Sequence, residues 1–336
     1  MYSSKIAGLG FYVPNNVVTN NDLIKIMDTT DAWIQERTGI QERRWAIRGS
    51  EDTTTTMGVK AAKIAIERAG VSNDAIDFII FATLSPDYYF PGPGVTVQKE
   101  LGLRTVGALD VRNQCSGFVY ALSVADNFIK TGMYKNILVI GSELHSHGLD
   151  KTTRGRGVSV IFGDGAGAAV VSRSEDLSKG ILSTHLHSEG EYAEELIVKA
   201  PGMGTRWVTD ILNEDDPSDE SYFPYMNGQF VFKNAVVRFS EVIMEGLQTN
   251  NLAVEDIDML IPHQANLRIS QFIQKKFNLS DEQVYNNIQH YGNTTAASIP
   301  IALTEAWEKG KIKEGDLVVL AAFGSGFTWG SVIIRW

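Results

Sequence analysis

Hydrophobic and polar positions along the chain form two recurring patterns. The first consists of apolar runs about seven residues long, such as residues 78–84 and 317–323. A membrane-spanning helix needs roughly 18 or more apolar residues, so these runs predict buried β-strands. In the second pattern, apolar residues recur every three or four positions, as in residues 118–129, which predicts an amphipathic helix. Strands that alternate with helices predict an α/β fold with helices packed on mixed sheets.

The same order of elements occurs twice. Ile76 and Ile257 each stand between a predicted helix end and a predicted strand, and they are 181 residues apart. Leu138 and Leu317 each lie in a strand that follows a helix, and they are 179 residues apart. These offsets predict a duplicated unit of roughly 180 residues, with halves at 1–175 and 176–336. Chance similarity between short amphipathic stretches is the alternative explanation.

Composition and charge restrict the partners that we expect. The chain has 40 acidic and 30 basic residues, a formal net charge of −10. Because nucleic-acid binding needs a basic surface, we expect no nucleic-acid partner. The N-terminal residues lack the apolar core of a signal peptide, and no run is long enough to cross a membrane. We therefore expect no membrane partner. The single cysteine, Cys115, excludes an intrachain disulfide and is typical of a cytoplasmic protein.

Cys115 is the first candidate for chemistry. It lies between a predicted strand at residues 106–111 and the predicted helix that follows. A thiol at the start of a helix is close to the positive end of the helix dipole, which lowers the thiol pKa and favours a nucleophile. The alternative is a buried and inert cysteine.

His263 and Asn293 are further candidates. His263 follows a predicted strand at residues 257–261, and active sites of α/β folds form at such strand ends. Asn293 precedes the predicted helix of the second half, where it is equally typical of an N-cap. If the halves pack about a pseudo-twofold axis, the helix starts at Cys115 and Asn293 meet, and His263 joins them. A thiol, an imidazole and an amide together suit acyl transfer through a thioester.

The remaining motifs are weaker signals. Residues 162–168 are glycine-rich but lead into a predicted strand, which disfavours a phosphate-binding loop. Residues 324–330 can bring backbone N–H groups close to a ligand, as in an oxyanion site. Two histidine pairs lack a neighbouring cysteine or carboxylate at a familiar spacing, so we expect no metal site. These pairs are His145 with His147 and His185 with His187.

Basic residues gather in three places despite the acidic total. Solvated charged faces are one explanation, and a surface for phosphates or for an acidic carrier protein is the other. The groups are Arg37, Arg43 and Arg44; Arg154 and Arg156; and Arg268, Lys275 and Lys276.

Five motifs occur together in one order. They are Asn-Gln-Cys-Ser-Gly (113–117), Phe-Gly-Asp-Gly-Ala-Gly-Ala (162–168), His-Gln-Ala-Asn (263–266), Tyr-Gly-Asn-Thr (291–294) and Gly-Ser-Gly-Phe-Thr-Trp-Gly (324–330). This set resembles the β-ketoacyl-acyl-carrier-protein synthase III family of condensing enzymes, and the resemblance covers essentially the whole chain. It implies a thiolase-like α/β fold in which two pseudo-duplicated βαβαβαββ halves form a five-layered α-β-α-β-α core.

The resemblance also implies an activity. An acyltransferase of this family would transfer an acyl group from acyl-CoA to Cys115. His263 and Asn293 would then support decarboxylation of malonyl-acyl-carrier protein, and condensation would give 3-oxoacyl-carrier protein, CoA and CO₂. The family uses a coenzyme A thioester as substrate and no separate cofactor, and its members are usually homodimers. The alternative is a synthase of secondary metabolism with the same fold and a different, for example medium-chain, acyl donor or acceptor.

Other positions take roles from the same resemblance. The backbone N–H groups of Cys115 and Ser325 would form the oxyanion hole, although the family commonly has glycine at position 325. Phe90 would close the acyl pocket of the partner subunit. Residues 202–225, with Trp207, Val208, Ile211 and Leu212, are either a pocket wall or a loop pinned to the surface. The expected CoA-binding residues are Trp33, Arg37, Arg156, Phe232 and Asn266, and the expected carrier-protein docking residues are Lys233, Arg268, Lys275 and Lys276.

Overall fold

A computed structural model of the chain describes residues 2–202 and 219–336. Two β-sheets form its centre. The first has the strand order β1-β7-β6-β4-β5, and the second has the order β11-β12-β13-β8. The strands of the first sheet are β1 (Ser3–Tyr12), β4 (Phe78–Ala82), β5 (Gly107–Val111), β6 (Asn136–Glu143) and β7 (Gly165–Ser174). Those of the second are β8 (Gly180–Ser188), β11 (Met259–Pro262), β12 (Leu317–Gly324) and β13 (Thr328–Arg335).

The two sheets repeat one topology. In the first, β4 runs parallel to β5 and β6, and β7 runs antiparallel to both β6 and β1. In the second, β11 runs parallel to β12, and β13 runs antiparallel to both β12 and β8. An isolated parallel bridge between Leu260 and Val284 occupies the place of β5. The predicted duplication is therefore confirmed, and the predicted boundary falls between the end of β7 and the start of β8.

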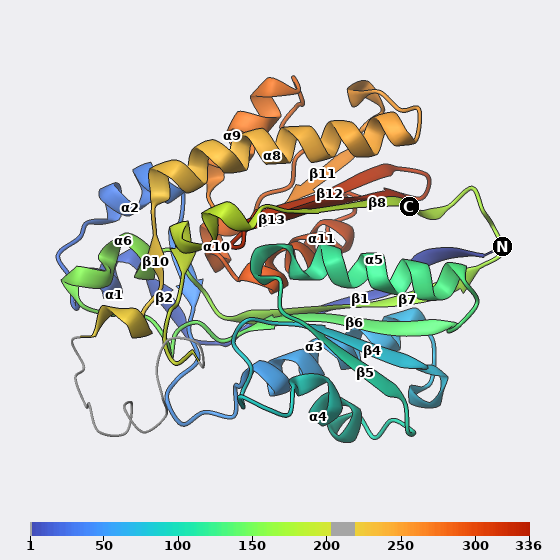
Figure 1. Cartoon of the computed structure of the whole chain (residues 1–336), viewed down its shortest axis with the longest axis horizontal. Coiled ribbons are helices and arrows are strands. Elements are labelled where there is room, and N and C mark those ends of the chain that lie inside the picture. The colour runs from blue at the N-terminus through green and yellow to red at the C-terminus, as the bar shows by residue number, and fades with distance from the viewer. Residues whose placement is uncertain (1, 203–218) are drawn as a thin grey trace.

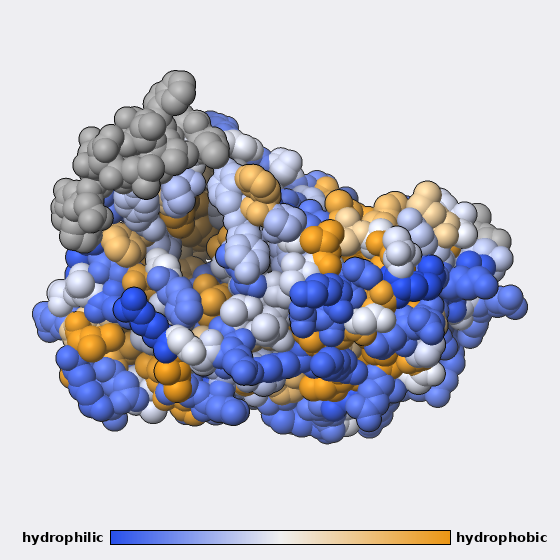
Figure 2. All heavy atoms as spheres, turned by 90° about the horizontal axis from the view of Figure 1, so that it is seen from below, coloured by the Kyte–Doolittle hydropathy of each residue, from blue (hydrophilic) through white to orange (hydrophobic). Residues whose placement is uncertain are grey.

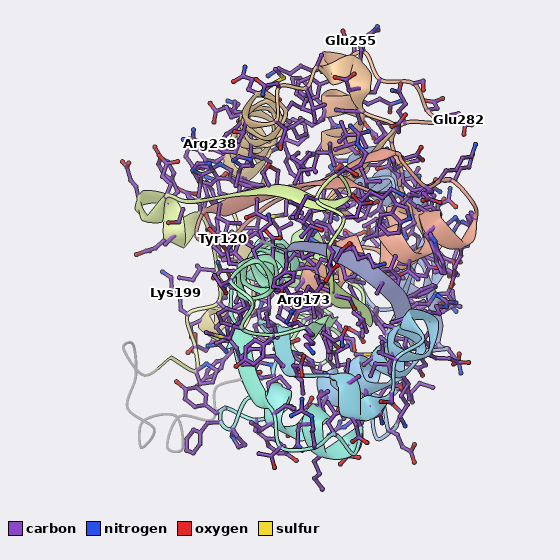
Figure 3. The ribbon with its side chains drawn as sticks, turned by 90° about the vertical axis from the view of Figure 1, so that its right-hand side faces the viewer. Tyr120, Arg173, Lys199, Arg238, Glu255 and Glu282 are labelled. Carbon is purple, nitrogen blue, oxygen red and sulfur yellow. The ribbon has the colours of Figure 1, made fainter. Side chains whose placement is uncertain are left out.

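Helices complete five layers (Figure 1). The outer layer of the first half contains α3 (Thr54–Ala69) and α4 (Pro93–Glu100), and that of the second contains α8 (Gly228–Thr249) and α9 (Leu267–Lys276). Between the sheets lie α5 (Gly117–Lys130) and α11 (Ser298–Glu308). Viewed from the side, α5 is seen nearly end-on between the sheets (Figure 3). The predicted α-β-α-β-α order is confirmed.

Burial follows from this layering. The central helices are covered on both sides, so α11 buries eight of its eleven residues. Strand β12 is buried at every position because helices cover both faces of its sheet. The outer layers face solvent, and Figure 2 shows a surface on which polar side chains predominate and apolar ones are scattered. Among the described residues, no helix is long and apolar enough to span a bilayer.

Shorter elements surround the entrance to the centre. They are β2 (Val17–Thr19), α1 (Asn20–Ile24), α2 (Asp31–Thr38), β3 (Glu42–Arg44), α6 (Arg156–Ser159), β9 (Leu196–Ile197), β10 (Tyr225–Met226) and α10 (Ile288–Tyr291). Their core includes Ile34, Trp45, Phe162 and Ile288. Four residues named above as a possible pocket wall, Trp207, Val208, Ile211 and Leu212, lie outside the described residues.

Candidate active site

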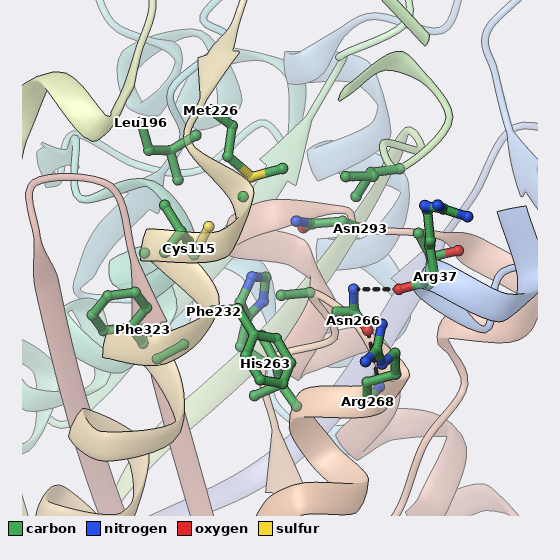
Figure 4. Close-up of a pocket in the computed structure, with 18 of the residues that line it drawn as sticks. Arg37, Cys115, Leu196, Met226, Phe232, His263, Asn266, Arg268, Asn293 and Phe323 are labelled. Atoms are coloured by element: carbon green, nitrogen blue, oxygen red, sulfur yellow. Dashed lines mark hydrogen bonds between the residues drawn. The ribbon is translucent and has the colours of Figure 1, made fainter. Parts of the chain in front are cut away.

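The three residues expected to act together line one cavity of about 660 Å³. Cys115 comes from the start of α5, His263 follows β11, and Asn293 precedes α11 (Figure 4). Each lies at the point where a strand ends or a helix begins in the middle of the molecule. The duplication explains why these residues lie together, because the segments that precede the two central helices are equivalent in the two halves.

Cys115 is held in a tight connection between β5 and α5. It lies in a 3₁₀ turn, Gln114–Ser116, and the preceding Gln114 has a left-handed backbone with φ +41°. Gly324 of the second half lies against it, and a Cβ atom at this glycine would be 2.8 Å from the Cys115 sulfur. The glycine therefore allows the turn after β12 to approach the thiol closely.

The environment of Cys115 differs from the sequence-based expectation. Burial, and secondarily the negative charge of Glu143, raise the pKa of the thiol to about 12. Hydrogen bonds from the backbone N–H groups of Ser325 and Cys115 act in the opposite direction and lower the pKa. The prediction of a lowered pKa considered only the helix dipole and was wrong, because removal of the thiolate from water is the larger effect. The thiol is protonated near neutral pH.

His263 presents one ring nitrogen to the cavity. Its Nδ1 lies 2.6 Å from Ser298 Oγ, whereas its buried Nε2 has no hydrogen-bond partner in the structure. Burial lowers the pKa of His263 to about 3, so the ring is neutral. A buried polar atom without a partner is rare and points to a ligand atom as its partner. Nε2 is thus suited to bind a substrate oxygen.

Asn293 is fixed by its own backbone and side chain. Its N–H donates to the Ile161 carbonyl at 2.8 Å, and its carbonyl accepts from the Gly163 N–H at 3.0 Å. The side-chain Oδ1 accepts from the Thr295 N–H at 2.8 Å. The amide nitrogen Nδ2 is therefore left to donate into the cavity. The glycine-rich residues 162–168 thus hold the Asn293 backbone in place. They continue into β7, as the sequence predicted.

Four of the five expected CoA-binding residues line the cavity, and the fifth, Arg156, lies beside one of them. Trp33 and Arg37 on α2, Phe232 on α8 and Asn266 before α9 all line the cavity. The guanidinium of Arg37 lies 4.5 Å from the centroid of the Trp33 ring, and that of Arg156 lies 5.2 Å from the same ring. Asn266 donates a hydrogen bond to the Arg37 carbonyl at 2.9 Å (Figure 4). An aromatic ring with two cations close to it suits a ligand that has a planar base and phosphates.

The other candidates lie farther out. Lys233 and Arg268 line the cavity, and the guanidinium of Arg268 lies 5.9 Å from the centroid of the Phe232 ring. Lys275 and Lys276 are exposed in the last turn of α9. Phe90 is 80% exposed in the single chain and does not line the cavity.

Two buried residues beside the site were missed by the sequence analysis. Ser298 contacts His263 and lies in the first turn of α11. Serine is common at helix starts because its hydroxyl bonds to nearby backbone groups. Glu143, at the end of β6, accepts hydrogen bonds from Ser85 Oγ at 2.6 Å and from the Ala296 N–H. Burial raises the pKa of Glu143 to about 7. No sequence signal identifies either role, because their partners are distant in the chain.

Within residues 2–202 and 219–336, no group of three histidine, cysteine or carboxylate side chains is arranged to hold a metal ion. His145 Nε2 lies 2.6 Å from Thr295 Oγ1, and His187 Nε2 lies 2.6 Å from Glu245.

Comparisons with known proteins match this architecture. A family model described as 3-oxoacyl-[acyl-carrier-protein (ACP)] synthase III matches residues 109–190, and the model of its C-terminal part matches residues 247–336. The chain is 46% identical over 333 residues to the beta-ketoacyl-[acyl-carrier-protein] synthase III of Aquifex aeolicus, covering 99% of both chains. It is 45% identical over 335 residues to the enzyme of the same name from Aliivibrio fischeri, covering all of both chains. The crystal structure of the Aquifex aeolicus enzyme superimposes with a TM-score of 0.90 at 45% identity, covering 99% of this chain and 100% of that one.

Proposed function

The chain belongs to the 3-oxoacyl-[acyl-carrier-protein] synthase III family, and from this membership we propose how its own residues carry out the reaction. It is an acyltransferase, a condensing enzyme of fatty acid synthesis. The names of its curated relatives do not favour the alternative role in secondary metabolism. The observation that carries the proposal is the meeting of one thiol, one neutral imidazole and one amide donor in a single cavity.

The first step is acylation of Cys115. The sulfur attacks the thioester carbonyl of an acyl-CoA, the carbon–sulfur bond to CoA breaks, and the thiol proton leaves with the CoA sulfur. Negative charge develops on the carbonyl oxygen in the transition state. The backbone N–H groups of Cys115 and Ser325 are both hydrogen-bond donors beside the sulfur. Because the carbonyl carbon bonds to this sulfur, its oxygen would lie close to the same donors, and we assign them to it.

The second step is decarboxylation of malonyl-acyl-carrier protein. The carbon–carbon bond to the carboxylate breaks and CO₂ leaves. The electron pair of the broken bond moves toward the thioester oxygen. His263 Nε2 and Asn293 Nδ2 are the two donors available to this oxygen. We propose that Ser298 donates to His263 Nδ1 and thereby keeps the proton on Nε2, because Ser298 Oγ also accepts from the Gln264 N–H at 3.4 Å.

The third step joins the two acyl groups. The nucleophilic carbon attacks the acyl-Cys115 carbonyl, the bond to the Cys115 sulfur breaks, and 3-oxoacyl-carrier protein leaves. The thiolate then takes up a proton. The thiol, the imidazole, the amide and the two backbone N–H groups account for these steps, and we propose a reaction without a metal or a further cofactor.

The outer cavity is the proposed substrate entrance. Trp33, Arg37 and Arg156 would hold the adenine and phosphates of CoA, and Phe232 and Asn266 would line the path of its pantetheine arm. An acidic carrier protein would dock on the cations around α8 and α9. These are Lys233, Arg268, Lys275 and Lys276.

We also propose a homodimer. Strand β5 lies at one edge of the first sheet, and three of its five residues are exposed in the single chain. An uncovered edge strand invites pairing with another chain. The aromatic side chains of Tyr88, Tyr89 and Phe90 are exposed in the same half. In such a dimer Phe90 would enter the partner's acyl pocket and limit the length of the acyl group.

Intact-protein mass spectrometry tests the function directly. The protein is incubated with a panel of acyl-CoAs and then with malonyl-acyl-carrier protein. We expect an acyl adduct on Cys115 that disappears in the second incubation as 3-oxoacyl-carrier protein and CO₂ form. The absence of any adduct with every donor would contradict the proposal.

A further inference from the structure

Ser325, in the turn between β12 and β13, has a side chain with a specific partner. Its Oγ donates a hydrogen bond to the Leu196 carbonyl oxygen at 2.5 Å. The turn accepts a serine without backbone strain, because a left-handed φ occurs at the next residue, Gly326, and not at Ser325. The hydroxyl is therefore an interaction that a glycine at this position would lack.

The register of the β9–β10 hairpin explains why the Leu196 carbonyl bonds to the Ser325 hydroxyl and not to the neighbouring strand. Strands β9 and β10 are antiparallel, with Leu196 opposite Met226. The neighbouring pair is hydrogen-bonded, since the Asn227 N–H donates to the Glu195 carbonyl at 2.9 Å. Hydrogen-bonded and non-hydrogen-bonded pairs alternate in an antiparallel ladder. The Leu196 carbonyl therefore points away from β10, toward the turn that contains Ser325.

The hairpin forms a wall of the active-site cavity. The side chains of Leu196 and Met226 both line it. Figure 4 shows both side chains on the same side of the Cys115 sulfur. Because Cys115, Leu196 and Met226 line one cavity, a wall at Leu196 would limit the space for an acyl chain attached to the sulfur.

The other side of the same turn contacts the nucleophile. Gly324 lies so close to Cys115 that an added Cβ atom would be 2.5 Å from the Cys115 Cβ. The Ser325 N–H is directed at the sulfur, and the Ser325 carbonyl accepts from Thr328 Oγ1 at 3.1 Å. Ser325 thus contacts the wall through its side chain and the nucleophile through its backbone.

We propose that Ser325 is a specificity-determining residue, which ties the wall at Leu196 to the backbone beside Cys115 and so slows the acylation of Cys115 by acyl groups that displace this wall. This inference rests on the proposed function. A longer acyl group pushes Leu196 outward, and the hydrogen bond transmits the displacement to Ser325. Its N–H then moves away from the developing oxyanion, and small displacements of such donors reduce rates strongly.

The site of this discrimination determines the measurement. In the proposed function the CoA portion binds through residues that do not belong to the hairpin, so binding of different acyl-CoAs should be similar. The discrimination should appear in the rate constant for acyl transfer to Cys115. Because Cys115 is the only cysteine, the mass of the intact protein reports this step alone.

The experiment compares wild type with Ser325→Ala, Ser325→Gly and Ser325→Thr. Single-turnover acylation rate constants are measured for straight-chain acyl-CoAs of two to ten carbons. In the Ala and Gly variants we expect the ratio of the ten-carbon to the two-carbon rate to rise roughly threefold to tenfold, the range for loss of one hydrogen bond. Ser325→Thr retains the hydroxyl and should keep a ratio close to that of wild type. The ratio separates specificity from a uniform loss of rate.

Ser331→Ala is the matched control. Ser331 Oγ likewise donates to a backbone carbonyl, that of Val242, at 2.9 Å; this bond is buried whereas that of Ser325 is partly buried, and Ser331 does not line the cavity. Its length ratio should equal that of wild type. An unchanged ratio in both Ser325→Ala and Ser325→Gly would overturn the inference, as would an equal rise in Ser331→Ala. If one Ser325 variant does not fold, the other decides. A wild-type protein that no acyl-CoA acylates contradicts the proposed function instead.

Discussion

The two halves of the molecule have the same strand order but bring different chemistry to the cavity. Cys115 lies in the turn directly before α5, and Asn293 precedes the equivalent helix α11. The Cys115 thiol can form and break covalent bonds, whereas the Asn293 amide acts only through hydrogen bonds. The duplication therefore supplies two equivalent helix starts, and the different side chains at these positions give the two halves different chemical roles. In the proposed function, the first half receives the acyl group and the second half activates the malonyl group.

The largest test of this division is removal of the nucleophile. Cys115→Ala should abolish condensation, because the chain contains no second thiol to accept the acyl group. Product formation from acyl-CoA and malonyl-carrier protein is measured. The same variant should retain decarboxylation of malonyl-carrier protein, since His263 and Asn293 are intact. Loss of both activities would show that the halves do not act separately.

The complementary test removes the donors of the second half. Asn293→Ala and His263→Ala should each lower the rate of malonyl decarboxylation by about 10²–10³, the effect of losing one oxyanion donor. Acylation of Cys115 should continue in both variants. Asn293→Asp is the sharper control, because it keeps the shape but replaces the donor with an acceptor. An Asp variant that condenses at the wild-type rate would mean that Asn293 does not act as a donor.

A third prediction concerns the pH dependence of the first-half nucleophile. Burial raises the pKa of Cys115 to about 12, so the thiolate fraction should rise about tenfold for each pH unit below that value. Alkylation by iodoacetamide should therefore become roughly a hundredfold faster between pH 7 and 9. A free cysteine model compound, with a pKa of about 8.5, levels off near pH 9 and serves as the reference. An alkylation rate of Cys115 that levels off below pH 9 would contradict the raised pKa.

A fourth and smaller effect is expected at Ser298, behind His263. Ser298→Ala leaves His263 Nδ1 without its partner and should lower the decarboxylation rate roughly threefold to tenfold. Acylation of Cys115 should be unaffected. Ser298→Thr keeps the hydroxyl and should restore most of the rate. Ser270→Ala removes a buried hydroxyl that has no hydrogen-bond partner in the structure, and it should change neither step.

The sequence predicted the duplicated fold well because apolar periodicity and repeat offsets depend on local order. It also placed Cys115, His263 and Asn293 at strand ends and helix starts, which the duplication brings together. It did not identify Ser298 or Glu143, which meet their partners across 35 and 58 residues of chain. It predicted the wrong direction for the Cys115 pKa, because burial depends on tertiary packing that a motif does not describe.

The smallest expected effect concerns the outer surface of the second half. Lys275 and Lys276 are exposed at the end of α9, and in the proposed function they attract an acidic carrier protein. The double variant Lys275→Glu/Lys276→Glu should raise the Michaelis constant for malonyl-carrier protein several-fold and leave that for acyl-CoA nearly unchanged. Because exposed charges are screened by salt, the effect should diminish as ionic strength rises from 0.01 to 0.15 M, where the Debye length falls from about 30 to 8 Å.

The control for this variant is Lys63→Glu/Lys99→Glu, which changes the net charge equally on α3 and α4, in the outer layer of the first half. If the control raises the Michaelis constant for the carrier protein as much, the effect reflects the total charge of the protein and not a docking surface. If the α9 variant raises the Michaelis constants for both substrates alike, α9 is not a docking surface for the carrier protein. The two halves would then differ in function only inside the cavity, where the donors of the second half face the thiol of the first.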